Sequence, residues 1–130
     1  LERLFLREET RPDYIALDLK LAPSRYNVLL PDQGRGPSRP GEALEQSAAL
    51  IRSSGIPHEF RTLVFPRTYI TEADIEALAP LTDGAPWYFR PFTPGNCLDP
   101  AWDMQEAAGP EAVEALARRA RELGKNGICR

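Results

Sequence analysis

Residues 13–21, with the sequence DYIALDLKL, are the stretch that most strongly predicts the fold of this chain. A short, largely apolar run bounded by Pro12 and Pro23 is typical of a β-strand that is covered on both faces. Because side chains alternate across a strand, Asp18 and Lys20 share one face, about 6.6 Å apart. The other face carries four apolar side chains: Ile15, Leu17, Leu19 and Leu21.

Two charges at the end of an apolar strand have more than one explanation. Asp18 and Lys20 form a structural ion pair, or the strand ends by Leu17 and both charges are solvated, or the two charges face a ligand. The pattern of this single strand leaves all three alternatives open.

The composition predicts one domain and argues against several classes of partner. A chain of 130 residues hides roughly two thirds of its extended surface on folding. Its 16 basic and 19 acidic residues are dispersed, so no basic stripe indicates a nucleic-acid partner. No apolar run approaches the roughly 20 residues that cross a bilayer. Cys97 and Cys129 lack the spacing of a zinc site or a disulfide framework, which favours a soluble protein of the reducing cytoplasm.

Helices and strands alternate along the chain. The first residues, with Leu1, Leu4 and Phe5 at helical spacing, are expected to be the tail of a helix. Residues 22–41 hold four prolines and three glycines and are predicted to form a long surface loop, and a turn-rich loop is predicted over residues 93–109. Further strands are predicted over residues 58–66, 87–92 and 127–130, and helices over residues 42–54, 71–83 and 110–124. Thr71 and Asp74 are expected to form a capping box.

This order predicts an α/β fold whose parallel strands follow one another in chain order, with helices on the outer face. Parallel strands without a closing partner leave open sheet edges. We therefore expect residues 1–130 to be the second half of a barrel. The open edge predicts an apolar surface and a homodimer or aggregation of the isolated chain.

Charged residues near the carboxyl ends of the strands indicate a binding site, because ligands of parallel α/β folds lie there. If Arg61 of the second strand converges with Asp18 and Lys20, the site offers two cations and one carboxylate. A guanidinium binds a carboxylate through two hydrogen bonds, and Asp18 accepts hydrogen bonds from ribose hydroxyls or binds a cation. Aromatic residues of a central strand are more often core, but three are candidates for an aromatic wall: Trp87, Phe89 or Phe92. An anionic, partly aromatic ligand suits such a site.

Three other reactive side chains are weaker candidates. His58 is the only histidine and is expected in an exposed loop position at the amino end of a strand. Cys97 follows the third strand and is expected to be inert, because it has no basic neighbour. Cys129 is expected to pack in the core. The sequence has no Gly-rich phosphate loop, Gly-x-Ser-x-Gly elbow or His-rich metal pattern.

Several segments together carry a resemblance to a known family. They are DYIALDLK (13–20), EFRTLVFP (59–66) followed by TEADI (71–75), FRPF (89–92) and GKNGICR (124–130). In this order they resemble the carboxyl-terminal half of radical SAM activating enzymes, in particular the activating proteins of anaerobic ribonucleoside-triphosphate reductase and of pyruvate formate-lyase. The resemblance covers nearly the whole chain, from the fourth strand of the family's six-stranded partial barrel to its end. It implies that residues 1–130 are the carboxyl-terminal part, the parallel-stranded half, of a partial, TIM-like (β/α)6 barrel.

The resemblance implies a function and a set of site residues. In that family a 4Fe-4S cluster binds S-adenosylmethionine and cleaves it reductively, and the 5′-deoxyadenosyl radical abstracts hydrogen from a glycine of a partner, the glycyl radical enzyme. By resemblance, Asp18 and Lys20 contact the sugar and carboxylate region of the cofactor, and Asp18 is also able to hold a cation. Arg61 matches the arginine near the methionine carboxylate. Thr93 stands where some members have a histidine, which puts its ribose contact in question.

The three-cysteine cluster motif of the family, Cys-x-x-x-Cys-x-x-Cys, does not occur in these 130 residues. Cys97 and Cys129 do not replace it, because one cluster needs three thiolates. We therefore expect the parent protein to be an oxidoreductase and this chain alone to be inactive, with no cofactor stably bound. The alternative hypothesis is a non-catalytic half-barrel that binds a protein partner or self-associates, in which Asp18, Lys20 and Arg61 form a buried ion network.

Overall fold

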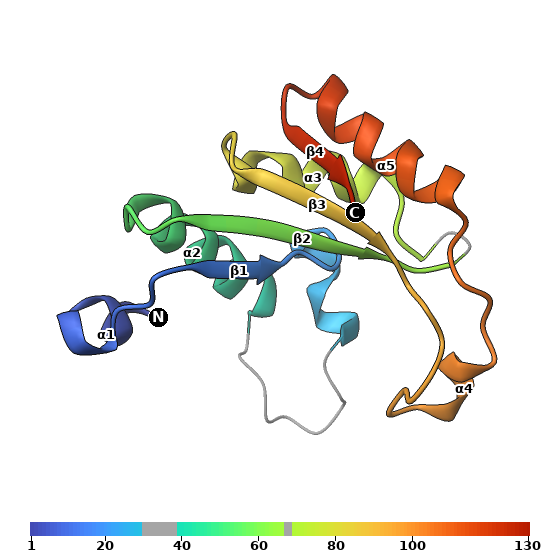
Figure 1. Cartoon of the computed structure of the whole chain (residues 1–130), viewed down its shortest axis with the longest axis horizontal. Helices are drawn as coiled ribbons and strands as arrows, with labels where there is room; N and C mark the ends of the chain where they lie inside the picture. The colour runs from blue at the N-terminus through green and yellow to red at the C-terminus, as the bar shows by residue number, and fades with distance from the viewer. Residues whose placement is uncertain (30–38, 67–68) are drawn as a thin grey trace.

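A sheet of four parallel strands forms the centre of the fold, and the strands lie side by side in chain order (Figure 1). The computed structural model describes residues 1–29, 39–66 and 69–130. The strands are β1 (Ile15–Asp18), β2 (His58–Val64), β3 (Pro86–Pro91) and β4 (Asn126–Cys129). The predicted α/β class, parallel pairing and strand order are confirmed.

Helices connect the strands. The α-helices are α1 (Glu2–Phe5), α2 (Pro40–Ser53), α3 (Glu72–Thr82), α4 (Pro100–Asp103) and α5 (Pro110–Glu122), and the 3₁₀-helices are η1 (Glu8–Thr10) and η2 (Pro23–Leu29). In the described ranges, none of the helices combines the length and the apolar character needed to span a bilayer.

Two of these helices correct the sequence-based expectations. η2 occupies the first part of the predicted loop over residues 22–41, whose residues 30–38 lie outside the described ranges. α4 interrupts the predicted loop over residues 93–109, and the Asp99 side chain caps it by accepting a hydrogen bond from the Ala101 amide at 2.9 Å. Local capping by one aspartate therefore makes a helical turn where prolines and glycines predicted irregular structure.

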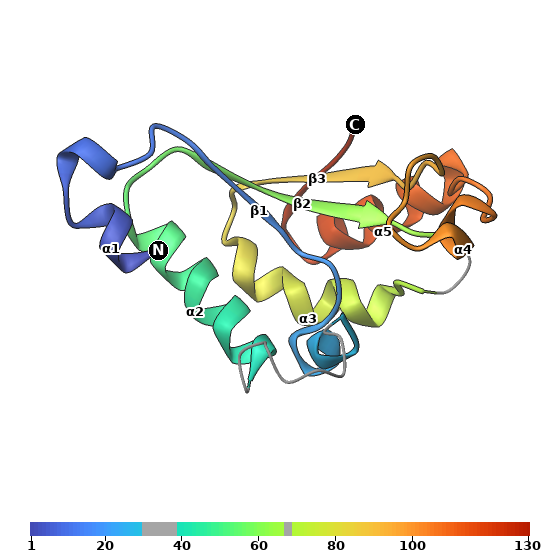
Figure 2. The same ribbon diagram turned by 90° about the horizontal axis from the view of Figure 1, so that it is seen from below.

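Helices cover one face of the sheet in the part of the chain that the structure describes. Figure 2 shows α2, α3 and α5 on the same side, with the C-terminus on the other side. The prediction that residues 13–21 are covered on both faces is therefore wrong. Leu19 and Leu21 are fully buried under the helices, whereas Asp18 and Lys20 are exposed.

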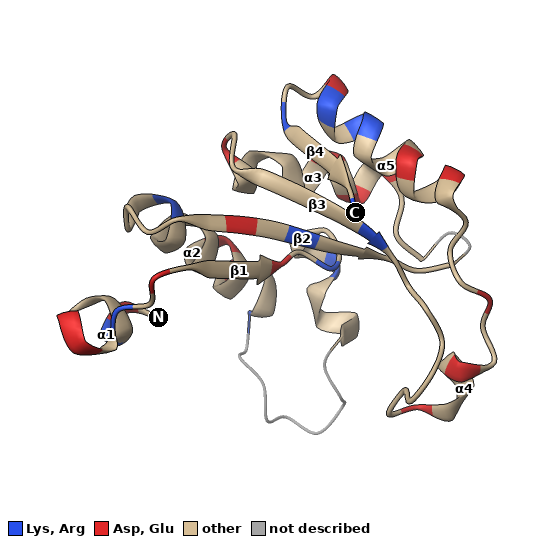
Figure 3. Cartoon of the chain, viewed as in Figure 1, with Lys and Arg blue, Asp and Glu red and all other residues tan. Residues whose placement is uncertain are grey.

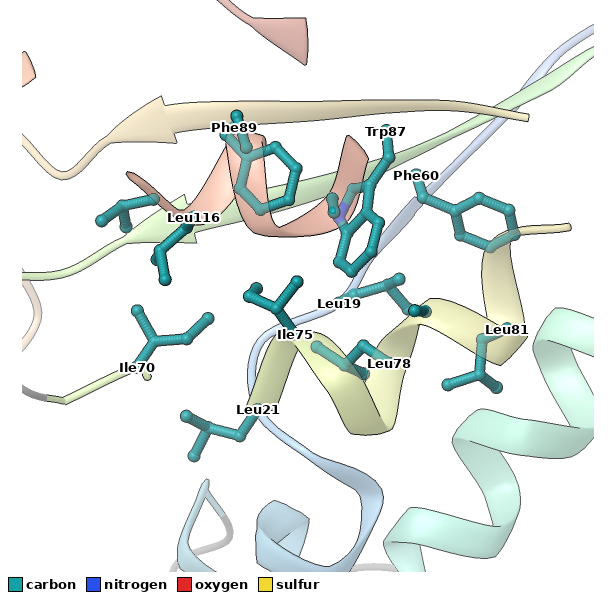
Figure 4. Packing of buried hydrophobic residues seen from close by; sticks show 14 of the residues in the cluster. Leu19, Leu21, Phe60, Ile70, Ile75, Leu78, Leu81, Trp87, Phe89 and Leu116 are labelled. Atoms are coloured by element: carbon teal, nitrogen blue, oxygen red, sulfur yellow. The ribbon is translucent and has the colours of Figure 1, made fainter. Parts of the chain in front are cut away.

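The hydrophobic core lies between the sheet and the covering helices (Figure 4). Its largest side chains are Trp87 and Phe89 of β3 and Phe60 of β2, none of which is exposed. Trp87 Nε1 donates a hydrogen bond to Thr62 Oγ1 at 2.9 Å, and this hydroxyl donates to the Leu19 carbonyl at 2.8 Å. The indole N–H is thus satisfied inside the core and ties three neighbouring segments together.

The segment that follows β1 is tied to α3 by a buried carboxylate. Asp74 is 1% exposed and accepts hydrogen bonds from the Ala22 amide at 2.9 Å and from the Arg25 guanidinium at 2.5 Å. It also accepts one from the Thr71 amide at 2.9 Å, which confirms the predicted capping box. Burial opposes ionisation of Asp74, but these three donors outweigh it, so the pKa of Asp74 lies below its ordinary value.

The last strand packs closely on α5 at a glycine. A Cβ atom on Gly127 would lie 2.5 Å from the carbonyl oxygen of Ala117, so this contact requires glycine. The expectation that Cys129 packs in the core is wrong, because the residue is exposed and its thiol donates to Glu114 of α5 at 3.0 Å.

Candidate functional site

A groove of about 410 Å³ lies on the uncovered face of the sheet, where β1, β2 and β3 end. We call it the sheet-edge groove. Its lining comes from these strands and the segments that follow them: Asp18, Lys20, Arg61, Thr62, Leu63, Phe65, Arg90, Pro91 and Thr93. Figure 3 shows basic bands on β2 and at the end of β3. This is the edge at which parallel α/β folds bind their ligands.

The structure brings the predicted constellation together. The sheet-edge groove is lined by all four residues that were predicted to contact the cofactor: Asp18, Lys20, Arg61 and Thr93. Asp18 pairs with Arg61 in the register of β1 and β2, so both side chains leave the same face. Leu63 pairs with Arg90 in the register of β2 and β3, which adds a third cation to the groove that the sequence analysis did not single out.

The aromatic wall of the groove comes from Phe65 rather than from the third strand. Trp87 and Phe89 are fully buried in the core on the opposite face, so the prediction that they line the site is wrong. Phe92 is also buried, and it stacks on Phe65 with ring centroids 5.1 Å apart. Trp102 of α4 packs on Phe65 at 5.1 Å as well. These rings hold Phe65 beside the groove.

Asp18 and Lys20 are exposed and are not paired with each other. Salt bridges between the described residues include neither of them, so the structural ion pair and the buried ion network are both wrong. The alternative in which the strand ends by Leu17 is close to what is observed, because β1 ends at Asp18. Solvated charges at this position remain able to contact a ligand.

Arg61 is held by a carboxylate on its own strand. Its Nε donates to Glu59 Oε1 at 2.6 Å, and the Arg61 side chain is 43% exposed. Within the described ranges, its two terminal amino groups have no hydrogen-bond acceptor on the protein. The hydrogen bond to Glu59 raises the pKa of Arg61, with burial opposing it. Arg61 is therefore a fixed cation with open donors at the groove.

Glu59 is the centre of a polar cluster that the sequence analysis missed. Its side chain is only 6% exposed although it lies on the uncovered face, because Tyr14, Arg61 and Arg130 surround it. Tyr14 Oη donates to Oε2 at 2.7 Å, and a terminal nitrogen of Arg130 lies 3.5 Å from Oε1. Arg130 also lies over the Tyr88 ring, 4.5 Å from its centroid. We call Glu59, Tyr14, Arg61 and Arg130 the Glu59 cluster.

The donors of the Glu59 cluster favour the ionised carboxylate. The hydrogen bond from Tyr14 is the main reason that the pKa of Glu59 lies below its ordinary value; burial opposes this effect, and Arg61 and Arg130 add to it. The same hydrogen bond raises the pKa of Tyr14. The sequence did contain a signal for this cluster. Glu59 and Arg61 are two positions apart, and residues at that spacing in a strand lie on the same face.

The weaker candidates lie outside the groove lining. His58 opens β2 and is half-buried rather than in an exposed loop, with Nδ1 2.8 Å from the Ile56 carbonyl oxygen and its ring edge-on to Phe60. The Cys97 amide donates a hydrogen bond to Asp103 Oδ1 at 3.1 Å, and the nearby carboxylate raises the pKa of the Cys97 thiol and leaves it protonated at neutral pH.

The chemistry of the groove suits an anionic ligand that also carries hydroxyl groups. Arg61 offers two terminal amino groups to a carboxylate, while Lys20 and Arg90 add positive charge. Asp18 accepts hydrogen bonds from hydroxyls, and Phe65 offers apolar contact. In residues 1–29, 39–66 and 69–130, no three Cys, His, Asp or Glu side chains are grouped to hold a metal ion, so a cation on Asp18 would need other ligands.

Comparison with known proteins found no family model, curated protein or solved structure that matches this chain. A functional assignment therefore depends on the groove and on the resemblance carried by the sequence motifs.

Proposed function

We propose that this chain is the carboxyl-terminal part of a radical SAM activating protein for a glycyl radical enzyme and that it contributes residues that bind S-adenosylmethionine. The observation that carries the proposal is the convergence of Asp18, Lys20, Arg61 and Thr93 on one groove. These residues come from β1, β2 and the segments that follow β1 and β3, and Asp18, Lys20 and Arg61 are the residues that match the motifs of the family.

The residues of the groove fit the polar groups of this cofactor. Arg61 binds the methionine carboxylate through its terminal amino groups, and Lys20 adds a point charge beside it. Asp18 accepts hydrogen bonds from the ribose hydroxyls. Thr93, which is one of the residues that line the groove, contacts the same sugar through its hydroxyl. When bound to an iron–sulfur cluster, the cofactor supplies radical chemistry. The cluster needs three thiolates, which the two cysteines of this chain do not provide, so we propose that another part of the protein supplies them.

The arrangement of the helices favours half of a barrel over a doubly wound sheet. A doubly wound fold covers both faces of its parallel sheet with helices, whereas a (β/α) barrel places all helices outside and turns the other face inward. Here α2, α3 and α5 share one side, and the opposite face carries the charged groove (Figure 2). We propose that this face lines the interior of a partial barrel that further strands complete.

Cofactor binding by the intact protein, with any residues that precede Leu1, tests the proposal. We expect its reading frame to encode the three-cysteine motif and the cluster-loaded protein to bind S-adenosylmethionine in calorimetry. On reduction with dithionite it should release 5′-deoxyadenosine. A Lys20→Met variant should bind more weakly, whereas a control on the exposed surface of α5, Arg118→Met, should not. A frame without the motif, or a folded and cluster-loaded protein that does not bind the cofactor, would overturn the proposal.

The alternative is a non-catalytic half-barrel that self-associates through its open edge. The observation that favours it is a group of exposed apolar side chains before edge strand β1, since Leu1 and Leu4 are each 46% exposed and Leu6 is 81% exposed. Analytical ultracentrifugation across a concentration series distinguishes the two. A dimer that Leu4→Glu and Leu6→Glu disrupt, combined with no cofactor binding, supports this alternative.

A further inference from the structure

We propose that Glu59 and Tyr14 are positioning residues that hold the Arg61 guanidinium so that its two terminal amino groups face the sheet-edge groove and bind a ligand carboxylate. This inference rests on the proposed function, because it concerns how the cofactor's carboxylate is recognised. It adds two residues that contact no ligand themselves and act through Arg61.

The geometry of the carboxylate shows a division of tasks. Glu59 Oε1 accepts from Arg61 Nε at 2.6 Å, and Glu59 Oε2 accepts from Tyr14 Oη at 2.7 Å. Tyr14 therefore fixes the carboxylate from the side of β1, and the carboxylate fixes the guanidinium by its inner nitrogen. No acceptor within the described ranges contacts the two terminal amino groups of this guanidinium, and Arg61 is one of the residues that line the groove.

Packing alone does not explain a buried carboxylate at this position. Glu59 lies on the face of the sheet that the described helices leave uncovered, yet its side chain is 6% exposed. An acidic side chain on an open face is ordinarily solvated, because burial of a charge costs free energy unless donors compensate it. Here the compensating groups are Arg61 on β2 itself, Tyr14 from before β1 and Arg130 from after β4.

Holding Arg61 in one orientation strengthens carboxylate binding. An arginine side chain loses rotamer freedom when it is fixed, and less is lost on binding if the free protein has already ordered it. Two parallel N–H···O bonds need a planar guanidinium at a defined angle. The effect of Glu59 should therefore appear only with ligands that carry a carboxylate.

Two ligands that differ in the carboxylate test this inference by calorimetry on the intact protein. The first is S-adenosylmethionine, and the second is 5′-methylthioadenosine, which lacks the aminocarboxypropyl group. We expect Glu59→Gln to weaken binding of the first about fivefold or more, as expected for loss of one charge-assisted hydrogen bond, and to leave the second within about twofold. In an Arg61→Ala background, Glu59→Gln should have no further effect.

Controls separate positioning from a structural role. Glu76→Gln breaks an ion pair of the same 2.6 Å length, with Arg119 on the helix side, and should change neither affinity. If Glu59→Gln does not fold, Tyr14→Phe is the second variant, because Tyr14 is 52% exposed and keeps its ring. It should weaken binding of S-adenosylmethionine about twofold to threefold, as loss of one hydrogen bond to the carboxylate predicts, and spare methylthioadenosine. Equal losses for both ligands, or no loss in folded variants, would overturn the inference.

A second measurement keeps the inference distinct from the proposed function. The Nε–H of Arg61 should show slow exchange with water in NMR spectra of the wild-type protein, and Glu59→Gln should make that exchange fast. If wild type binds neither ligand, the proposed function fails, while the exchange data still show whether Glu59 orders Arg61. If wild type binds S-adenosylmethionine and Glu59→Gln does so equally well, the proposed function stands and the positioning role falls.

Discussion

The two faces of the sheet differ in what their side chains contact. On the face covered by α2, α3 and α5, strand residues such as Phe60, Trp87 and Phe89 have no exposed surface. On the other face β2 carries Glu59 and Arg61, and the residues beside Arg61 on the two neighbouring strands are Asp18 and Tyr88. A strand alternates its side chains with period two, so one segment supplies both the core and the candidate site. Substitutions one position apart are therefore expected to have different kinds of consequence.

The largest expected effect on stability comes from truncating a side chain on the covered face of the sheet. Trp87→Ala removes a fully buried indole and its hydrogen bond to Thr62, and we expect a loss of about 3 to 5 kcal/mol in the free energy of unfolding. Tyr88→Ala, the next residue, should cost about 1 kcal/mol or less, because it loses mainly the contact with Arg130. Urea denaturation followed by circular dichroism measures both. Equal losses would show that the open face contributes as much to stability as the core.

A smaller loss of stability is expected at the buried carboxylate that joins η2 to α3. Asp74→Asn should lower the free energy of unfolding by about 2 to 3 kcal/mol at pH 7, because bonds from Ala22, Thr71 and Arg25 then lose a charged acceptor. The pKa of Asp74 in the folded chain lies below its ordinary value of 3.8. The stabilisation is therefore complete above pH 3.8 and is lost as pH falls through the folded-state pKa.

The pH dependence gives this prediction its control. The difference between wild type and Asp74→Asn should be constant from pH 7 to about 5 and should shrink below pH 4. Asp83→Asn changes an exposed carboxylate at the end of the same helix and should show no such difference. A gap between wild type and Asp74→Asn that does not shrink at all as the pH falls below 4 would mean that the carboxylate charge is not what stabilises this junction.

The alternation of side chains between the two faces of each strand was predictable from the sequence. Which face of the sheet the helices cover was not. In β2, Phe60, Thr62 and Val64 alternate with the residues of the other face, and all three are buried. Residues 13–21 are apolar enough to suggest cover on both faces, yet one face is left uncovered by the described helices. Whether a helix packs on a face depends on where the connections cross the sheet, and no single strand carries that information.

In the candidate site, too, one part was predictable from the sequence and another was not. The convergence of Asp18, Lys20 and Arg61 followed from topology, because the carboxyl ends of parallel strands meet at one edge. The hydrogen-bond partner of Arg61 was not predictable from the topology. The register places Asp18 opposite Arg61, but the Arg61 Nε atom donates its hydrogen bond to Glu59. That choice depends on rotamers and on Tyr14, which approaches Glu59 from 45 positions earlier in the chain.

On the uncovered face the expected effects concern binding rather than stability. Arg61→Ala in the intact protein should weaken S-adenosylmethionine binding by about 1.5 to 3 kcal/mol, because a charge-assisted contact with the carboxylate is lost. Its stability should change less than that of Trp87→Ala. Arg118→Ala, on the exposed surface of α5, is the matched control and should bind as wild type does. Calorimetric titration of the cofactor into the folded variants measures these affinities. An unchanged affinity of Arg61→Ala would show that Arg61 does not contact the cofactor.

The smallest effect is expected at Thr93, which is exposed at the groove just after β3. Thr93→Val keeps the shape of the side chain and removes only the hydroxyl, so it deletes at most one neutral hydrogen bond to the ribose, worth about 0.5 to 1.5 kcal/mol. The affinity for S-adenosylmethionine should therefore fall by about tenfold or less. Thr10→Val, at another exposed threonine outside the groove lining, is the control for removal of a hydroxyl and should leave the affinity unchanged. A larger loss at Thr93 would show that the hydroxyl also orders the loop that carries Phe92 and Trp102, whereas no loss would make Thr93 a wall of the groove without a polar contact to the sugar.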